Sequence, residues 1–220
     1  MKKRNLILVR HGQSEWNAKN LFTGWENPGL TETGKTEAKN AGNLINNLDI
    51  DFDCLFTSAL IRAQLTGTII LKAINQNNIK IIENKALNER FYGDLQGMNK
   101  DECKQKWGEE LVQTWRRSYE LGPPGGETLK ETGDRVLPYY LNEIHPMLMQ
   151  DMNIIVAAHG NSLRSLIKYL DKVSDEDIVK LEIPTGAPIH YLFNEDGKVC
   201  LLYTSPSPRD TLLSRMPSSA

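Results

Sequence analysis

Residues 6–12 read Leu6-Ile7-Leu8-Val9-Arg10-His11-Gly12, four apolar residues that run into an arginine, a histidine and a glycine. A continuous apolar run of this kind, without helical spacing, is typical of a strand that is buried on both faces of a sheet. Open α/β sheets bind their ligands outside the carboxyl ends of such strands. The stretch therefore predicts a central strand whose arginine and histidine face a ligand crevice.

A second copy of the pattern lies far down the chain, in Ile154-Ile155-Val156-Ala157-Ala158-His159-Gly160-Asn161. Of the four histidines in the sequence, His11 and His159 each end an apolar run and are followed by glycine. One such histidine would most often be structural, but two in the same context predict two imidazoles that converge on one site. His145 and His190 lack this context, and we assign them no role.

The remaining pattern predicts an α/β fold with a mostly parallel sheet and helices on both faces, because short apolar runs alternate with amphipathic segments. The last two runs flank the turn Asn194-Glu195-Asp196-Gly197 and predict a hairpin. The predicted strands are 6–9, 54–57, 79–82, 154–158, 189–193 and 198–203. The length of 220 residues suits one such domain with a full core.

Helix signals lie between these strands. Thr31 is a predicted N-cap, and Thr128 and Glu131 have the spacing of a capping box at the start of a long helix that Pro138 would kink. The apolar stripe of the first helix is predicted to be Ala38, Ala41, Leu44, Ile45 and Leu48. Further helices are predicted at 59–74, 99–107 and 109–120, after His159 through Leu170, and from Ser174. Residues 13–26 and 87–97 are predicted to be polar loops.

The predicted domain spans residues 1–203. Residues 204–220 are rich in serine and proline and hold three of the ten prolines, so we predict a disordered tail and interpret it as a candidate non-native extension.

The bulk charge and the cysteines limit the partners. A formal net charge of −2 gives no global attraction for nucleic acid, so an anionic ligand needs local cations. The apolar run at 6–9 is too short for a signal peptide or a membrane span. Cys54, Cys103 and Cys200 form neither a disulfide framework nor a metal pattern, which favours a reducing cytoplasm. We expect a cytoplasmic protein that uses a small molecule, without nucleic acid, membrane or metal.

Phosphoryl chemistry fits the residues around the two histidines. Arg10 and Arg62 are permanent cations whose forked donors match phosphate oxygens, although Arg62 alone would as readily be a surface ion pair. Gly12 and Gly160 let backbone approach a ligand closely. Together with the imidazoles they predict a cage for a phosphoryl group.

A metal-free phosphohistidine mechanism needs a nucleophile and a proton carrier. A neutral imidazole can attack phosphorus and hold the group covalently. Glu89 is the best proton carrier, and we expect desolvation among aromatic residues to raise its pKa toward the working range. The alternatives for Glu89 are a solvated loop acid or a partner of Arg90, and Glu15 is a poorer candidate in an open polar loop.

The segment Leu8-Val9-Arg10-His11-Gly12-Gln13-Ser14-Glu15-Trp16-Asn17 resembles the signature of the histidine phosphatase superfamily. Further segments resemble, more narrowly, the 2,3-bisphosphoglycerate-dependent phosphoglycerate mutase family. They are Phe22-Thr23-Gly24-Trp25, Asn88-Glu89-Arg90-Phe91-Tyr92-Gly93, Leu95-Gln96-Gly97, Trp115-Arg116-Arg117, Ala158-His159-Gly160-Asn161-Ser162 and Ile183-Pro184-Thr185-Gly186. The resemblance covers about residues 4–203 and implies the corresponding fold.

The resemblance also implies site roles. His11 would be the phosphorylated nucleophile, Glu89 the proton donor and acceptor, and His159 a stabiliser of the transferring group with Arg10 and Arg62. The residues implied to bind substrate are Arg10, His11, Gly12, Gln13, Ser14, Glu15, Trp16, Asn17, Thr23, Gly24, Arg62, Glu89, Arg90, Phe91, Tyr92, Lys100, Arg116, Arg117, Gly160 and Asn161.

The implied reaction interconverts 3-phosphoglycerate and 2-phosphoglycerate in glycolysis and gluconeogenesis, with His11 primed by 2,3-bisphosphoglycerate and without a metal. Such substrates have two anionic ends, so a second cationic station is needed beyond the cage. The oligomeric state stays open, with a homodimer as one possibility, because the connection 118–127 is shorter than the insertion that many such mutases have there. Two alternatives also stay open: a histidine phosphatase that hydrolyses small phosphoesters, and a non-catalytic module that binds a phosphorylated ligand.

Overall fold

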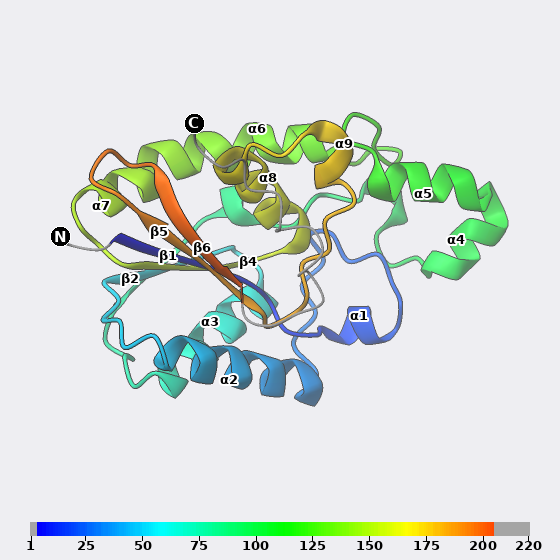
Figure 1. Ribbon diagram of the computed structural model, residues 1–220. Coiled ribbons are helices and arrows are strands. Elements are labelled where there is room, and N and C mark those ends of the chain that lie inside the picture. Colours follow the sequence, from blue (N-terminus) through cyan, green and yellow to red (C-terminus); the bar gives the residue numbers. More distant parts are fainter. Residues whose placement is uncertain (1–3, 205–220) are drawn as a thin grey trace.

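The computed structural model describes residues 4–204, and the side chains up to residue 200. Within this part of the chain, six strands form one sheet in the order β3-β2-β4-β1-β5-β6 (Figure 1). Strands β1 to β4 are parallel, whereas β5 is antiparallel to its neighbours β1 and β6. The predicted α/β fold with a mostly parallel sheet and a C-terminal hairpin is therefore confirmed. The strands are β1 Arg4–Arg10, β2 Cys54–Thr57, β3 Lys80–Glu83, β4 Ile154–Ala158, β5 Pro188–Phe193 and β6 Val199–Thr204.

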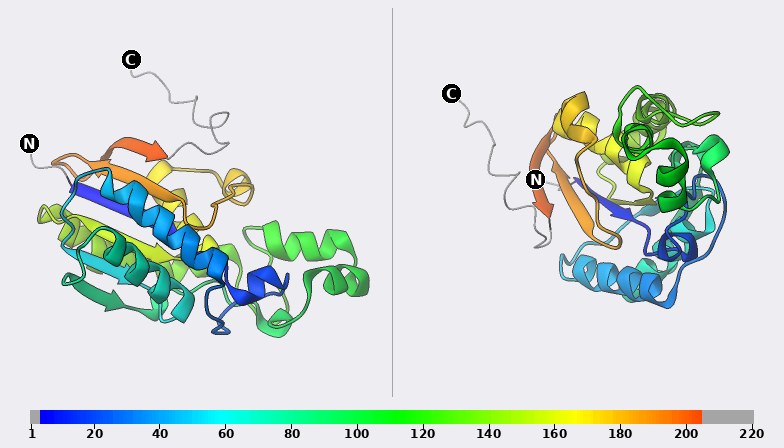
Figure 2. Two further views of the ribbon diagram at one scale, coloured as in Figure 1. Left: turned by 90° about the horizontal axis from the view of Figure 1, so that it is seen from below. Right: turned by 90° about the vertical axis from the view of Figure 1, so that its right-hand side faces the viewer.

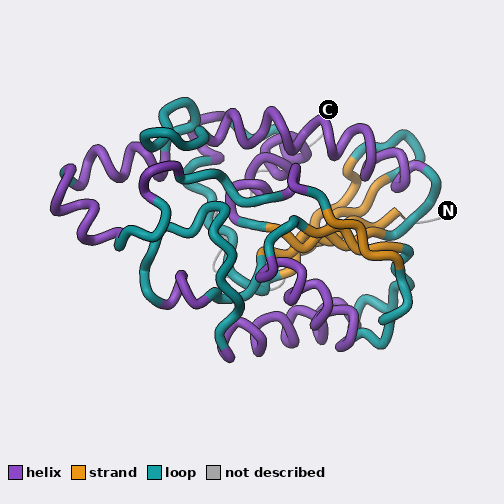
Figure 3. The backbone as a smooth tube through the Cα atoms, turned by 180° about the vertical axis from the view of Figure 1, so that it is seen from behind, coloured by secondary structure: helices purple, strands orange, loops and turns teal. Residues whose placement is uncertain are grey.

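Helices cover both faces of this sheet (Figures 1 and 3). Helices α2 and α3 lie on one face, and α6, α7 and α8 lie on the other. Helices α4 and α5 project beyond the sheet at one end of the molecule, as the left view of Figure 2 shows. The helices are α1 Glu15–Ala18, α2 Glu32–Asn46, α3 Ile61–Ala73, α4 Lys100–Trp107, α5 Glu109–Arg117, α6 Leu129–Tyr139, α7 His145–Met149, α8 Gly160–Asp171 and α9 Asp175–Ile178.

Strand β1 explains why the sheet is covered on both sides. Its side chains alternate, so that Leu6 and Leu8 pack in the core under α6 and α8, while Ile7 and Val9 pack in the core under α2 and α3. All four are 0% exposed. Burial of each such side chain contributes about 1.5–3 kcal/mol, so a polar substitution on either face would be costly.

The register of β1 against β4 sets the position of the two histidines. Arg10 pairs with Ala158 in the parallel ladder, and the backbone N–H of His11 donates to the carbonyl of Ala158 at 2.9 Å. His11 and His159 therefore leave the sheet at the same level of its carboxyl edge. This is the physical reason why two distant segments of the chain contribute to one site.

Several local predictions need correction. The loop predicted at 13–26 contains α1, which Ser14 caps through a reciprocal capping box with Asn17. The helix predicted at 109–120 ends at Arg117, and the strand predicted at 79–82 lies at 80–83. The predicted apolar stripe is too wide, since Leu44 and Leu48 are exposed. Leu48 lies beyond the end of α2, and the buried face of this helix includes Gly42, where a Cβ would lie 2.5 Å from that of Ala73 on α3.

Other local predictions hold. Thr128 and Glu131 form the predicted capping box, and the long helix leaves α geometry for a π turn at Tyr140–Ile144, directly after Pro138. Strand β6 includes Thr204, which pairs with Ile189, so the chain is still in the sheet where the tail was predicted to begin. The remainder of the predicted tail, residues 205–220, lies outside the described residues. None of the helices in the described part is long and apolar enough to cross a membrane.

Candidate active site

A cavity opens where β1 and β4 end. We call Arg10, His11, Arg62 and His159 the inner cluster, because they meet at the sheet edge. The ring centroids of His11 and His159 are 4.9 Å apart. The cavity is lined by Arg10, His11, Asn17, Leu21, Phe22, Thr23, Gly24, Arg62, Glu89, Tyr92, Lys100, Arg116, Arg117, Gly160, Asn161, Arg164 and Glu182.

His11 is held in the form that a nucleophile requires. Its Nδ1 lies 2.7 Å from the carbonyl oxygen of Gly12, which only accepts, so Nδ1 carries the proton and Nε2 keeps a lone pair. Burial lowers the pKa of His11 well below 6.5, and the charges of Arg62 and then Arg10 lower it further. The imidazole is therefore neutral at physiological pH.

His159 lies behind His11 and does not itself line the cavity, because it is 0% exposed. Its Nε2 is 2.7 Å from Ser58 Oγ, a hydroxyl that already accepts from the Leu60 N–H. If the hydroxyl donates to Nε2, the His159 proton sits on Nδ1, which is buried without a partner among the described residues. Burial and the nearby charges of Arg62, His11 and Arg10 lower the pKa of His159 well below 6.5.

The two inner arginines are fixed by carbonyl groups. Arg62, on the first turn of α3, donates to the carbonyl oxygens of Glu26 and Gly24 at 2.8 Å each, and Arg10 donates to that of Ile183 at 2.7 Å. The Nε atoms of both arginines are buried without a partner among the described residues. Burial lowers the pKa of Arg62 to about 10, against the raising effect of Glu89, so it stays charged. These unused donors fit an anion.

Glu89 is buried beside these cations. Its Oε1 accepts from the backbone N–H of Arg90 at 2.8 Å and from the backbone and side chain of Asn161 at 3.0 and 2.9 Å. The Oε2 atom faces the Cα of Gly160, where a Cβ would lie 3.7 Å away. Burial raises the pKa of Glu89, but the Arg90 N–H, Arg10, Asn161 and Arg62 together outweigh it. The pKa is lowered, so the predicted rise is wrong for the ligand-free protein.

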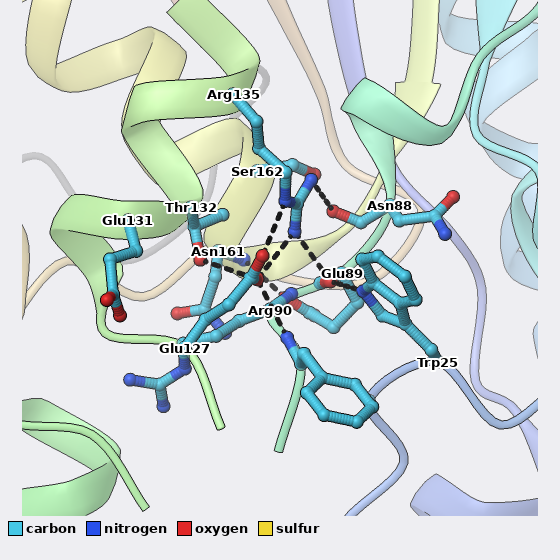
Figure 4. A network of polar contacts seen from close by, with 12 residues as sticks. Trp25, Asn88, Glu89, Arg90, Glu127, Glu131, Thr132, Arg135, Asn161 and Ser162 are labelled. Carbon is cyan, nitrogen blue, oxygen red and sulfur yellow. Dashed lines mark hydrogen bonds and ion pairs between the residues drawn. The ribbon is translucent and has the colours of Figure 1, made fainter. Parts of the chain in front are cut away.

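A single ion pair supports the loop that carries Glu89 (Figure 4). Arg135 on α6 donates to the carbonyl oxygens of Ala86, Asn88 and Glu89 at 2.8, 3.0 and 2.8 Å. It also forms two hydrogen bonds of 2.8 Å with the carboxylate of Glu127. The Trp25 indole donates to the Glu89 carbonyl at 2.7 Å. The backbone of Glu89 is therefore anchored from two directions.

A second group of cations lines the same cavity. We call Lys100, Arg116, Arg117 and Arg164 the outer cluster; the first three come from α4 and α5, and the last from α8. Burial and the charge of Arg116 lower the pKa of Lys100. Arg164 donates to the Asn161 side chain at 3.1 Å, and the amide of Asn161 in turn donates to Glu89, which connects the outer cluster to Glu89. The outer cluster therefore adds cationic donors for an anion beside those of the inner cluster.

Some of the residues implied to bind substrate do not line the cavity; they are Gly12, Gln13, Ser14, Glu15, Trp16, Arg90 and Phe91. Gly12 packs against α2, where a Cβ would meet the Gly34 oxygen at 2.1 Å. Ser14 caps α1. Arg90 is 0% exposed and donates to Tyr92 Oη and the Arg116 carbonyl. Gly12, Ser14 and Arg90 are therefore buried structural residues here, whereas Glu15 is exposed.

Sequence reasoning missed Arg164 and Glu182. Arg164 lies one helical turn after Gly160, so the helix predicted after His159 gave the spacing that could have identified it. Glu182 lies in the loop before β5, and no sequence pattern indicates that this loop returns to the cavity. The predicted lining residues Asn17, Thr23, Gly24, Tyr92 and Asn161 do lie there.

Comparisons with known proteins agree with this fold. The family profile of the histidine phosphatase superfamily (branch 1) matches residues 6–206, and the chain belongs to this superfamily. The chain is 58% identical over 194 residues to a 2,3-bisphosphoglycerate-dependent phosphoglycerate mutase from Parvibaculum lavamentivorans, covering 88% of this chain and 92% of the relative. A mutase of the same name from Bartonella henselae is 54% identical over 197 residues, covering 90% and 96%. Within the superfamily, the chain therefore groups with the 2,3-bisphosphoglycerate-dependent phosphoglycerate mutases.

Solved structures support the fold alone. A mycobacterial glucosyl-3-phosphoglycerate phosphatase in complex with VO3 has a TM-score of 0.77 at 21% identity, covering 93% of this chain and 98% of that chain. Among residues 4–204, no group of three or more His, Cys, Asp or Glu side chains could hold a metal ion.

Proposed function

We propose that this chain interconverts 3-phosphoglycerate and 2-phosphoglycerate through a phosphohistidine on His11. One observation carries the proposal: a neutral imidazole with a free Nε2 stands in a cavity that holds two cation clusters. The inner cluster suits a phosphoryl group in transfer, whose charge lies on its equatorial oxygens. The outer cluster suits the other anionic end of a phosphoglycerate. The names of the mutase relatives support the same reaction.

The transfer steps follow from the positions of His11 and Glu89. With the phosphoryl group on His11, the ionised Glu89 takes a proton from the free hydroxyl of the substrate as that oxygen forms a bond to phosphorus. The bond from phosphorus to Nε2 breaks, which restores neutral His11. In the second half, Nε2 attacks the other phosphoryl group, and Glu89 returns the proton to the departing oxygen.

The lowered pKa of Glu89 suits this order of events, because the carboxylate must be ionised when the first hydroxyl arrives. The anionic phosphoryl group then reduces the net positive charge that Arg10 and Arg62 exert on Glu89. A nearby negative charge raises the pKa of a carboxyl group, which prepares Glu89 to hold the proton until the second half. We propose that His159, Arg10 and Arg62 stabilise the transferring group.

The residues present fit 2,3-bisphosphoglycerate as the primer. The unused Nε atoms of Arg10 and Arg62 are buried donors that an anion would satisfy. When bound, the bisphosphate supplies the phosphoryl group that His11 first receives. We propose that Asn17, Thr23, Gly24, Tyr92 and Asn161 orient the ligand, with Lys100, Arg116 and Arg117 on its second anionic end. Closure of the cavity against water would favour transfer over hydrolysis.

A coupled assay with 3-phosphoglycerate, run with and without 2,3-bisphosphoglycerate, tests the proposal. We expect turnover that depends on the bisphosphate. Phosphate release that is independent of the bisphosphate would instead indicate a phosphatase, and an inert protein would indicate a binding module.

The variant His11→Ala gives the largest expected effect. We expect turnover to fall by on the order of 10⁴ or more, because the covalent step is lost. Intact-mass measurement after incubation with 2,3-bisphosphoglycerate should find a phosphoryl adduct on the unchanged protein and none on the variant. An adduct on the variant would contradict the assignment of His11.

Two further expectations belong to this proposal, one on cellular location and one on subunit number. A cytoplasmic location is supported by Cys54, Cys103 and Cys200, which are all free thiols. A homodimer is supported by the edge strand β3, where Ile81 is 44% exposed. Light scattering coupled to size-exclusion chromatography measures the subunit number directly.

A further inference from the structure

The loop between α9 and β5 contacts cations of both clusters. Its carbonyl groups at Val179, Leu181 and Ile183 accept from Arg117, Arg164 and Arg10 at 3.1, 2.9 and 2.7 Å. One short stretch of backbone therefore accepts hydrogen bonds from three arginines that line the cavity.

A carboxylate in the same loop completes this arrangement. Glu182 lines the cavity, where its Oε1 accepts a hydrogen bond from Arg117 and its Oε2 lies 3.8 Å from Arg164. Of the residues that line the cavity, Glu182 and Glu89 are the two carboxylates. Glu89 accepts its hydrogen bonds from Arg90 and Asn161, and Glu182 accepts from Arg117, so Glu182 is the carboxylate that is paired with the outer cluster.

The carboxylate of Glu182 balances part of the positive charge of Arg117 and Arg164. Burial and the neighbouring Arg117 charge lower the pKa of Arg164 to about 10, while Glu89 and Glu182 raise it. Clustered cations repel one another, and a carboxylate among them relieves that repulsion in the ligand-free protein. An incoming anion at this position competes with Glu182 for Arg117 and for the nearby Arg164.

We propose that Glu182 is a specificity-determining residue that occupies the outer anion station in the ligand-free protein and yields it to the second anionic end of the substrate. The proposal rests on the proposed function for the identity of the substrate. A ligand with one anionic end binds at the inner cluster and leaves Glu182 in place. A ligand with two anionic ends must displace Glu182 from Arg117, so the carboxylate of Glu182 weakens the binding of such a ligand. Only a ligand whose own second anionic end replaces this ion pair then binds well.

Calorimetric titration of the unprimed full-length protein tests this with a matched pair of ligands. 3-Phosphoglycerate has a carboxylate at its second end, whereas glycerol 3-phosphate has a neutral hydroxyl there. The variants are Glu182→Gln, which keeps the shape and removes the charge, and Glu182→Asn as a second neutral form. The control is Glu176→Gln on α9, which removes the same charge at an exposed residue that does not line the cavity.

We expect Glu182→Gln to bind 3-phosphoglycerate about two- to fivefold more tightly, in the range expected when a competing exposed ion pair is removed. Glu182→Asn should change in the same direction. Binding of glycerol 3-phosphate should be unchanged or weaker in both variants, and Glu176→Gln should leave both ligands within error of the unchanged protein. Thermal unfolding verifies that each variant is folded.

Three outcomes would overturn the proposal: no tighter binding of 3-phosphoglycerate in either neutral variant, an equal gain for both ligands, or an equal gain in Glu176→Gln. The measurement needs no turnover. A ligand-selective gain in a protein whose turnover does not depend on bisphosphoglycerate would therefore reject the proposed function and keep the role of Glu182.

Discussion

The inner and outer clusters differ in how far their side chains are exposed to solvent. His11, Arg62 and His159 are 0–2% exposed; backbone carbonyl groups hold His11 and Arg62, and the Ser58 hydroxyl holds His159. Arg117 keeps 26% of its side-chain surface exposed and is paired with a carboxylate that is 66% exposed. The comparison shows that the two imidazoles and Arg62 are shielded from solvent, whereas the Arg117–Glu182 pair is solvated; Arg164 of the outer cluster is itself buried, at 8% exposed.

Solvation makes the two clusters respond differently to conditions. The Debye length is about 8 Å at physiological ionic strength, so salt screens exposed charges and has much less effect on buried ones. We infer that salt acts on substrate affinity through the outer cluster and leaves the phosphoryl step nearly unchanged. The three predictions below test the two clusters separately.

Glu89→Gln tests whether the inner cluster needs a titrating group. Glutamine keeps an oxygen that can accept from Arg90 and Asn161, so the loop should keep its geometry. Because an amide cannot carry the proton, we expect turnover to fall by about 10²–10⁴. Steady-state kinetics and a pH profile measure the loss. Nearly full activity would mean that Glu89 is only a hydrogen-bond acceptor for the loop.

The pH dependence of stability tests whether the two imidazoles are held neutral. Their pKa values lie well below 6.5 in the folded protein, whereas in the unfolded chain both protonate near pH 6.5. The unfolded state therefore binds more protons, and stability is present above pH 6.5 and lost as the pH falls toward the folded values. The slope should reach about 1.4 kcal/mol per pH unit for each imidazole.

Urea unfolding between pH 8 and pH 5.5 measures this slope. The control is His11→Gln, which should lose about half of it. Comparing the two proteins also cancels Asp171, whose pKa burial raises to about 6 and whose contribution has the opposite sign. Equal slopes would contradict a neutral His11.

Arg117→Gln tests the outer cluster and has the smallest expected effect. We expect KM for 3-phosphoglycerate to rise about tenfold through loss of a charged hydrogen bond, with kcat nearly unchanged. Its affinity should also depend less on salt than that of the unchanged protein. Lys180→Gln, which removes an exposed cation paired with Asp177 outside the cavity, is the control. A loss confined to kcat would place Arg117 at the reacting centre instead.

Local patterns were sufficient to predict the inner cluster. The alternating burial of β1 and β4 follows from continuous apolar runs, and the parallel order of the sheet brings both ends to one edge. His11 and His159 could be paired from sequence because the same context occurs twice. Its place in a loop among aromatic residues indicated Glu89, and the resemblance then indicated the cations of α4 and α5.

The rest depended on contacts between segments that share no local pattern. The pKa of Glu89 moves opposite to the prediction because the Arg90 N–H, the charge of Arg10, the Asn161 amide and the charge of Arg62 together outweigh its burial. Arg135 and Glu127 support the Glu89 loop, but neither residue differs in sequence from an ordinary surface charge. Glu182 reaches the cavity because its loop returns along the arginines, a path that only the three-dimensional fold defines.

The pairing of β1 with β4 also has a consequence for biosynthesis. Leu6 leaves the ribosome early, yet its ladder partner Ile154 emerges only after most of the domain has been translated. Contacts between such distant segments form slowly, since a long loop must close first. A nascent polypeptide that ends before His159 therefore lacks the imidazole pair on which the proposed reaction depends.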